Sequence, residues 1–259
     1  MSQTIYHQTA PTNPIGIRQL SRGAVLAVWA AAALPMGAAA WIVAPAIEGS
    51  LGEMGLFKAL VLSLTGGLIW QALLVFALVS AEQGTLRWSQ LRDALWLRSP
   101  RSPKTGRRGG RLWWVVLPLI ALYSVGEFIP TLSHPEDRDF GIILESDAGQ
   151  AFFSGNWGWF GLVVVMFLFN TVLGEELLFR GYLLPRMQEA FGERAWLMNG
   201  FLFGTYHLHV PWIIPAAVLV DTFAISYPTQ RYRSAWIGII VHSVQSVFLV
   251  IALLVLVLE

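Results

Sequence analysis

Two adjacent carboxylates, Glu175 and Glu176, lie at the end of a strongly apolar stretch that begins near Trp157. A charged residue at the middle of a membrane-inserting helix costs about 2.5–3.5 kcal/mol, and less toward the helix end. On a helix, Glu176 and Arg180 are i,i+4 neighbours that can neutralise each other. Glu175 projects about 100° away from Glu176 and has no such local partner. An unpaired carboxylate within a membrane predicts a functional site.

Two histidines on later apolar segments are candidate partners for the unpaired glutamate. His207 shares a helix face with Phe203, and His242 shares one with Gln245 and Ser246. A lone histidine in a membrane is often only a hydrogen-bonding link between helices. Three polar groups on separate apolar helices are best satisfied by facing one another. This pattern therefore predicts a single polar cluster inside a helical bundle.

Such a cluster has two chemical interpretations. A carboxylate beside a neutral imidazole can hold a water molecule and take its proton, which creates a nucleophile for a carbonyl carbon. A second imidazole, with a hydroxyl or amide beside it, can then donate to the oxyanion that forms. One Glu and two His are also the ligand set of a catalytic zinc site, here Glu175, His207 and His242. The H-E-x-x-H spacing is absent, and the sequence leaves both a metal-free and a metal-dependent hydrolase open.

The composition predicts the fold class. Of the 259 residues, 55% are hydrophobic and only 13% are charged, whereas soluble domains carry about 25% charged residues. The apolar residues fall into blocks of membrane-spanning length, which predicts an all-α, polytopic membrane bundle. The absence of cysteine excludes thiolate chemistry, disulfides and Cys-ligated metals.

The chain divides into a polar tail, residues 1–22, and a single membrane domain, residues 23–259. Apolar blocks separated by polar loops predict seven spans within that domain. Their approximate ranges are 23–47, 57–80, 112–129, 157–186, 196–209, 212–227 and 235–258.

Charge differs sharply between the loops. Residues 81–111 contain eight basic residues and two acidic ones, whereas residues 130–156 contain five acidic residues and one arginine. Because Lys and Arg are retained on the cytoplasmic side, the N-terminus is expected to be cytoplasmic and the C-terminus outside. The basic loop is thus foremost a topology signal, with contact to anionic lipid as the second interpretation. In a bacterium, the expected location is the plasma (inner) membrane.

The order and spacing of the polar residues resemble the three-part signature of the CPBP intramembrane proteases. This family includes the CAAX prenyl endopeptidases and the bacteriocin-processing and immunity proteins. The resemblance covers about residues 155–258, and its motifs are Glu175-Glu176-x-x-x-Arg180, Phe203-x-x-x-His207 and His242.

The resemblance implies a role for each motif residue. Glu175 and His207 would activate the hydrolytic water, and His242 would help to stabilise the oxyanion. Glu176 and Arg180 would hold the helix and the site in register.

The third motif departs from the family pattern. The family usually has Asn or Asp four residues after this histidine, and this chain has Ser246. The neighbouring Gln245 is an alternative source of an amide donor.

The leading hypothesis is an intramembrane endopeptidase that cuts near the cytoplasmic leaflet. The expected partners are membrane lipids and a peptide or prenylated protein substrate that is lipid-anchored or membrane-inserted, and no nucleic acid. The expected cofactor is either none or a divalent metal such as zinc. Ser246 keeps open a catalytically silent binding or immunity scaffold. A third hypothesis is a transporter with Glu175, His207 and Asp221 as a proton relay, although the sequence contains no evident inverted repeats.

Overall fold

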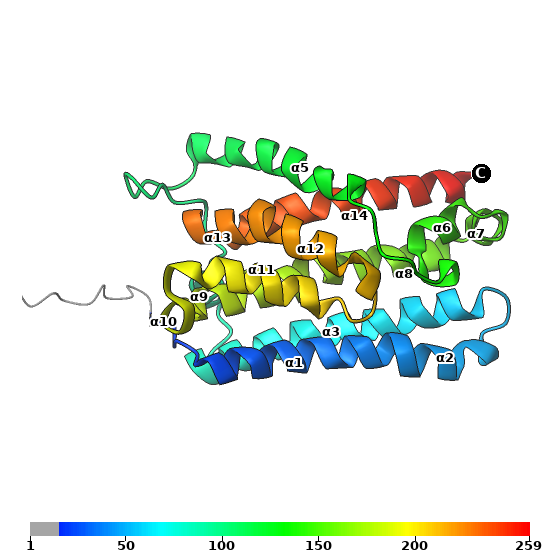
Figure 1. The fold of residues 1–259 in the computed structure, drawn as a ribbon, viewed down its shortest axis with the longest axis horizontal. Coiled ribbons are helices and arrows are strands. Elements are labelled where there is room, and N and C mark those ends of the chain that lie inside the picture. The colour runs from blue at the N-terminus through cyan, green and yellow to red at the C-terminus, as the bar shows by residue number, and fades with distance from the viewer. Residues whose placement is uncertain (1–15) are drawn as a thin grey trace, which may run out of the picture.

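The structure, a computed structural model, describes residues 16–259 and contains no β-strand within that range. Most of the predicted tail, residues 1–22, therefore lies outside the described residues. The described chain forms a bundle whose main helices run roughly along one common axis (Figure 1). This arrangement confirms the predicted all-α bundle.

Six helical stretches are long and apolar enough to cross a membrane: Arg22–Ser50, Gly55–Gln83, Gly110–Phe128, Trp157–Arg186, Pro211–Tyr232 and Ala235–Leu258. Within them lie α1 (Arg22–Ala38), α2 (Ala44–Ile47), α3 (Gly55–Gln83), α5 (Val116–Ser124), α8 (Trp157–Leu168), α9 (Leu184–Arg186), α12 (Ile214–Asp221), α13 (Tyr227–Tyr232) and α14 (Ala235–Leu258). Outside them lie α4 (Trp88–Ala94), α6 (Phe140–Glu145), α7 (Asp147–Phe153), α10 (Gln188–Phe191) and α11 (Ala195–Tyr206).

The structure has six such stretches among the described residues, whereas the sequence predicts seven spans. The difference lies at residues 196–209. This segment forms α11, which has 12 residues and is therefore about 18 Å long, shorter than the hydrocarbon core of about 30 Å. The segment 211–213 then starts the return toward α12 and α13. In Figure 1 the turn between α11 and α12 lies inside the length of the bundle, short of the ends of α2 and α14.

Large apolar side chains cover much of the outer surface of the long helices. Leu73 on α3 is 58% exposed and Phe248 on α14 is 68% exposed. A soluble protein would bury such side chains, whereas in a bilayer they face lipid tails. The chain is therefore a multi-pass membrane protein.

The loops at one end of the bundle are joined by hydrogen bonds. The Leu20 amide donates to the Arg186 carbonyl, the Arg101 amide to Tyr232 and the Ala235 amide to Trp96. These bonds bring together four segments that are rich in Lys and Arg, residues 16–22, 81–111, 186–194 and 231–233, and we call this end of the bundle the basic end. Of the 17 basic residues, all except Lys58, Arg138 and Arg180 lie in these segments.

The opposite end carries the acidic loop, and we call it the acidic end. Here the Gly155 amide donates to Val257, and the Leu132 amide donates to Trp212. Trp41 Nε1 donates to the Leu208 carbonyl at 2.7 Å, which ties the turn after α11 to the first long helix.

Candidate active site

The helix that carries the two glutamates is π-helical on both sides of them. The segments Phe169–Gly174 and Leu177–Leu183 have π-helical hydrogen bonding. On an α-helix, residues five apart project about 140° from one another, but a π-helix places them one above the other. The first π segment therefore brings Asn170 onto the same face as Glu175.

Glu175 is 1% exposed and has polar partners from two helices. With its side-chain amide oriented so that both groups are satisfied, Asn170 donates to the two Glu175 carboxylate oxygens at 2.7 and 3.0 Å. Tyr206 at the end of α11 also hydrogen-bonds to Glu175, and its hydroxyl accepts from Gln71 Nε2 at 2.6 Å. These neutral partners fix the position of the carboxylate and leave its charge uncompensated by an ion pair within the described residues.

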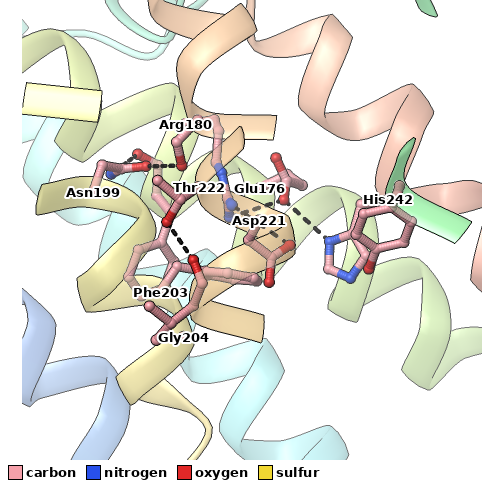
Figure 2. A network of polar contacts seen from close by, with 12 residues as sticks. Glu176, Arg180, Asn199, Phe203, Gly204, Asp221, Thr222 and His242 are labelled. Atoms are coloured by element: carbon pink, nitrogen blue, oxygen red, sulfur yellow. Dashed lines mark hydrogen bonds and ion pairs between the residues drawn. The ribbon is translucent and has the colours of Figure 1, made fainter. Parts of the chain in front are cut away.

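Glu176 is the centre of a buried ionic network, as the i,i+4 spacing predicts. Arg180 Nη1 lies 3.1 Å from Glu176 Oε1, and both side chains are fully buried. Arg180 Nη2 also lies 3.9 Å from Asp221 Oδ1, and its guanidinium stacks 3.9 Å from the centre of the Phe203 ring. His242 Nδ1 lies 3.1 Å from the same Glu176 oxygen. Figure 2 shows the Glu176 carboxylate between Arg180 and His242.

The hydrogen bonds of the two histidines define their tautomers. His207 Nδ1 lies 3.0 Å from the Phe203 carbonyl and 3.3 Å from the Gly204 carbonyl. Since a carbonyl only accepts, Nδ1 carries the proton and Nε2 of a neutral ring has a free lone pair. The contact of His242 Nδ1 with a carboxylate places a proton on that nitrogen too. His242 Nε2 can donate to an oxyanion only when the ring carries both protons.

Glu175, His207 and His242 line one cavity of about 310 Å³ between the helices. Asp221, Phe203 and Gln245 line it too. Glu176 and Arg180 are not among its lining residues and lie behind it, in the supporting network that the sequence predicts for them.

Two polar residues of the third motif, Gln245 and Ser246, differ in whether they line the cavity. Gln245 lines the cavity, donates from Nε2 to Glu127 Oε1 at 2.9 Å, and accepts from the Tyr123 hydroxyl at 3.4 Å. Ser246 is buried but is not among the cavity-lining residues. Of these two residues of the third motif, only Gln245 presents a donor group to the cavity.

The described residues contain no group of three or more His, Asp or Glu side chains arranged to hold a metal ion. His242 directs Nδ1 toward Glu176, and His207 directs Nδ1 toward backbone carbonyls, so Nε2 is the ring nitrogen that each histidine has available for the cavity. The ligand set Glu175, His207 and His242, which the sequence leaves open for zinc, is not assembled as a metal-binding group among the described residues.

Three further polar residues that are not part of the three sequence motifs belong to this site: Asn170, Tyr206 and His209. The position of Asn170 depends on the π-helical register, and that of Tyr206 depends on the packing of α11 against the helical segment that carries the glutamates. His209, which lies two residues before Pro211, lines the cavity, and its ring lies 5.5 Å from that of His207. An Asn five residues before a membrane glutamate is a signal that can reveal a π-helical pair in other sequences.

The site is a cavity lined by Glu and His side chains inside a bundle of membrane helices. Residues 156–248 match the sequence model of a protease family, the type II CAAX prenyl endopeptidase Rce1-like family. The match includes every motif residue named above and confirms the predicted resemblance to the CPBP intramembrane proteases. Comparisons with curated proteins and with solved structures gave no significant match.

Gly238 allows α14 to pack closely against Glu176 and Ile225. A Cβ atom at this position would collide with the Glu176 carboxylate and would lie 2.9 Å from Ile225 Cγ2. We expect Gly238→Ala to lower the free energy of unfolding by about 1–3 kcal/mol because the packed neighbours must move. Thermal unfolding in detergent or nanodiscs measures this change.

Gly66 provides the matched control, since it is also helical and a Cβ atom added there would have no neighbouring atom within 4 Å. Gly66→Ala should be neutral or should stabilise the protein by up to about 1 kcal/mol, owing to the higher helix propensity of Ala. Equal effects of the two substitutions would contradict the close approach at Gly238.

Proposed function

We propose that this protein is an intramembrane endopeptidase that hydrolyses a peptide bond of a membrane-anchored polypeptide. The observation that carries the proposal is the single cavity lined by Glu175, His207 and His242, within the region that matches a CAAX protease family. The cavity of about 310 Å³ is large enough for a short extended segment.

In the proposed reaction, a water molecule binds between the Glu175 carboxylate and the free Nε2 of His207. One of these groups takes a proton as the water oxygen attacks the carbonyl carbon of the peptide. The resulting oxyanion accepts hydrogen bonds from doubly protonated His242 and from the Gln245 amide. The carbon–nitrogen bond then breaks, and the proton passes to the leaving amine.

The test of the proposal is hydrolysis of membrane-anchored peptides by the purified protein, with and without a chelator, beside Glu175→Ala. Turnover that persists with chelator and disappears in the variant supports the metal-free reaction. Turnover that chelator abolishes would contradict the metal-free mechanism. A wild-type protein without turnover on prenylated and unprenylated membrane peptides would favour the scaffold, which the substitution of Ser246 for Asn or Asp supports.

Gln245 and Ser246 can be separated by substitution. We expect Gln245→Ala to lower turnover by about 10²–10³-fold, the effect of removing an oxyanion donor. Ser246→Ala should have a much smaller effect, because Ser246 does not line the cavity. Val247→Ala is the control for the helix, since Val247 is 55% exposed on the outer surface. A larger loss in Ser246→Ala than in Gln245→Ala would assign the donor to the serine.

We further propose that the basic end is cytoplasmic, following the distribution of Lys and Arg. The chain has no cysteine, so single cysteines report on topology without background. Lys104→Cys in the basic loop should react with an impermeant maleimide only from the cytoplasmic side, and Gln150→Cys on α7 only from the opposite side. Labelling of both from one side would contradict this topology.

A further inference from the structure

The catalytic cavity is closed toward the basic end. Six side chains between the cavity and that end are fully buried: Phe179, Arg180, Leu183, Ile225, Ser226 and Ile237. The residues that line the cavity include none from the four basic segments. A polypeptide at the basic end therefore has no open path to Glu175.

The cavity instead extends toward the acidic end. Its lining includes Glu127, Ile129 and Thr131, which lead into the acidic loop, and Val210 and Ile213, which follow the short helix α11. Glu127 and Thr131 are exposed, whereas Glu175 and Asp221 at the other limit of the cavity are buried. Because α11 ends after 12 residues, its turn leaves room for this opening.

We propose that the catalytic cavity opens to the non-cytoplasmic side, so that the substrate is a segment of an exported, membrane-anchored polypeptide. The inference rests on the proposed function, by which the bound polypeptide is a substrate. The side of the membrane follows from the distribution of Lys and Arg. It replaces the expectation of cleavage near the cytoplasmic leaflet. A prenylated C-terminus on a cytoplasmic protein lies on the wrong side of the membrane to enter.

The test uses Ala217→Cys, since Ala217 lines the cavity and has no role in the proposed chemistry. Leu219→Cys is the matched control, because Leu219 lies two residues further on the same helix, is 54% exposed and does not line the cavity. A charged, membrane-impermeant methanethiosulfonate is added to right-side-out and to inverted membrane vesicles. Ala217→Cys should react in right-side-out vesicles alone, Lys104→Cys in inverted vesicles alone, and Leu219→Cys, which faces lipid, in neither.

Reaction of Ala217→Cys in inverted vesicles alone would overturn the inference, and so would its failure to react in both. These outcomes are independent of turnover. A protein that hydrolyses peptides but reacts only from the cytoplasmic side keeps its proposed function and loses the sidedness. A protein that reacts from outside without any turnover keeps an outward cavity and loses the protease assignment.

A second, independent observation lies at the basic end. A cavity of about 330 Å³ is lined by Arg92, Arg98, Arg108, Trp113 and Trp236, together with Leu97 and Ser99. Arg98 pairs with Asp93, and Arg108 Nη1 donates to the Ser99 carbonyl at 3.0 Å. Arg92 Nε is buried without a hydrogen-bond partner. The cavity thus holds three guanidinium groups with one neighbouring carboxylate.

The surroundings of this cavity change the pKa of one of its arginines. The pKa of Arg108 is lowered by burial and by the nearby charges of Arg101 and Arg98. Trp113 and Trp236 lie in the first turns of two membrane stretches, the depth at which tryptophan meets lipid headgroups. We infer that this cavity binds the phosphate of an anionic phospholipid headgroup between its arginines.

The probe is phosphatidylglycerol added to purified protein, compared with phosphatidylcholine and with inorganic phosphate. We expect phosphatidylglycerol to raise the melting temperature of the wild type. The rise should be lost in Arg92→Gln and kept in Arg107→Gln, which changes an exposed arginine of the same loop that does not line the cavity. Equal rises with phosphatidylcholine, or in both variants, would overturn the site. An equal rise with inorganic phosphate would assign it to a free anion and overturn the lipid.

Discussion

Glu175→Gln should lower peptide hydrolysis by on the order of 10²–10⁴-fold, the contribution of general acid–base catalysis. Glutamine keeps the shape of the side chain and can still accept a hydrogen bond from Asn170 or Tyr206. It cannot take a proton from water. The loss should appear in the turnover number, because the substitution leaves the volume of the cavity unchanged. Steady-state kinetics on a membrane-anchored peptide measure it.

The same variant should keep or gain thermal stability. Glu175 is 1% exposed and has no ion-pair partner among the described residues, so neutralising it removes a buried charge. A fall in turnover with an unchanged melting temperature identifies a chemical role rather than a structural one. Full turnover in Glu175→Gln would remove Glu175 from the reaction and with it the proposed mechanism.

The fold class was predictable because membrane insertion imposes a simple rule on sequence. Stretches of about 20 apolar residues must be helical in lipid, and six of the seven predicted spans are long helices. The segment 196–209 was harder to interpret, because Pro211 shows where a helix stops but not at what depth. Its real length depends on the packing of α11 against α12, which no local pattern encodes.

Part of the site was predictable for a similar reason. The ion pair of Glu176 with Arg180 follows from i,i+4 spacing, and the distance of 3.1 Å confirms it. The partners of Glu175 were not predictable from α-helical spacing, since Asn170 reaches it through a π-helical segment. The contact of His242 with Glu176 rather than Glu175 depends on how two distant helices rotate against each other. Such rotations are set by packing and not by sequence spacing.

The substitution with the largest expected effect on stability is Arg180→Gln. The Arg180 guanidinium is fully buried, lies near the carboxylates of Glu176 and Asp221, and stacks on Phe203. Removing it leaves two buried carboxylates without their shared counter-charge, and breaking a buried ion pair in this way typically costs about 3–5 kcal/mol. We expect a large fall in melting temperature and in the yield of folded protein. Glu176→Gln should act in the same direction, because it leaves the arginine with only the more distant Asp221.

Arg194→Gln is the matched control, since Arg194 is exposed at the basic end, where substitutions usually change stability by less than about 0.5 kcal/mol. The double variant Arg180→Gln/Glu176→Gln separates charge from shape. If the cost comes from the uncompensated carboxylate, the double variant should be more stable than Arg180→Gln alone, because one of the two buried negative charges is gone. A double variant whose loss equals the sum of the two single losses would show that Arg180 and Glu176 contribute independently, and would contradict the ionic network as the support of the site.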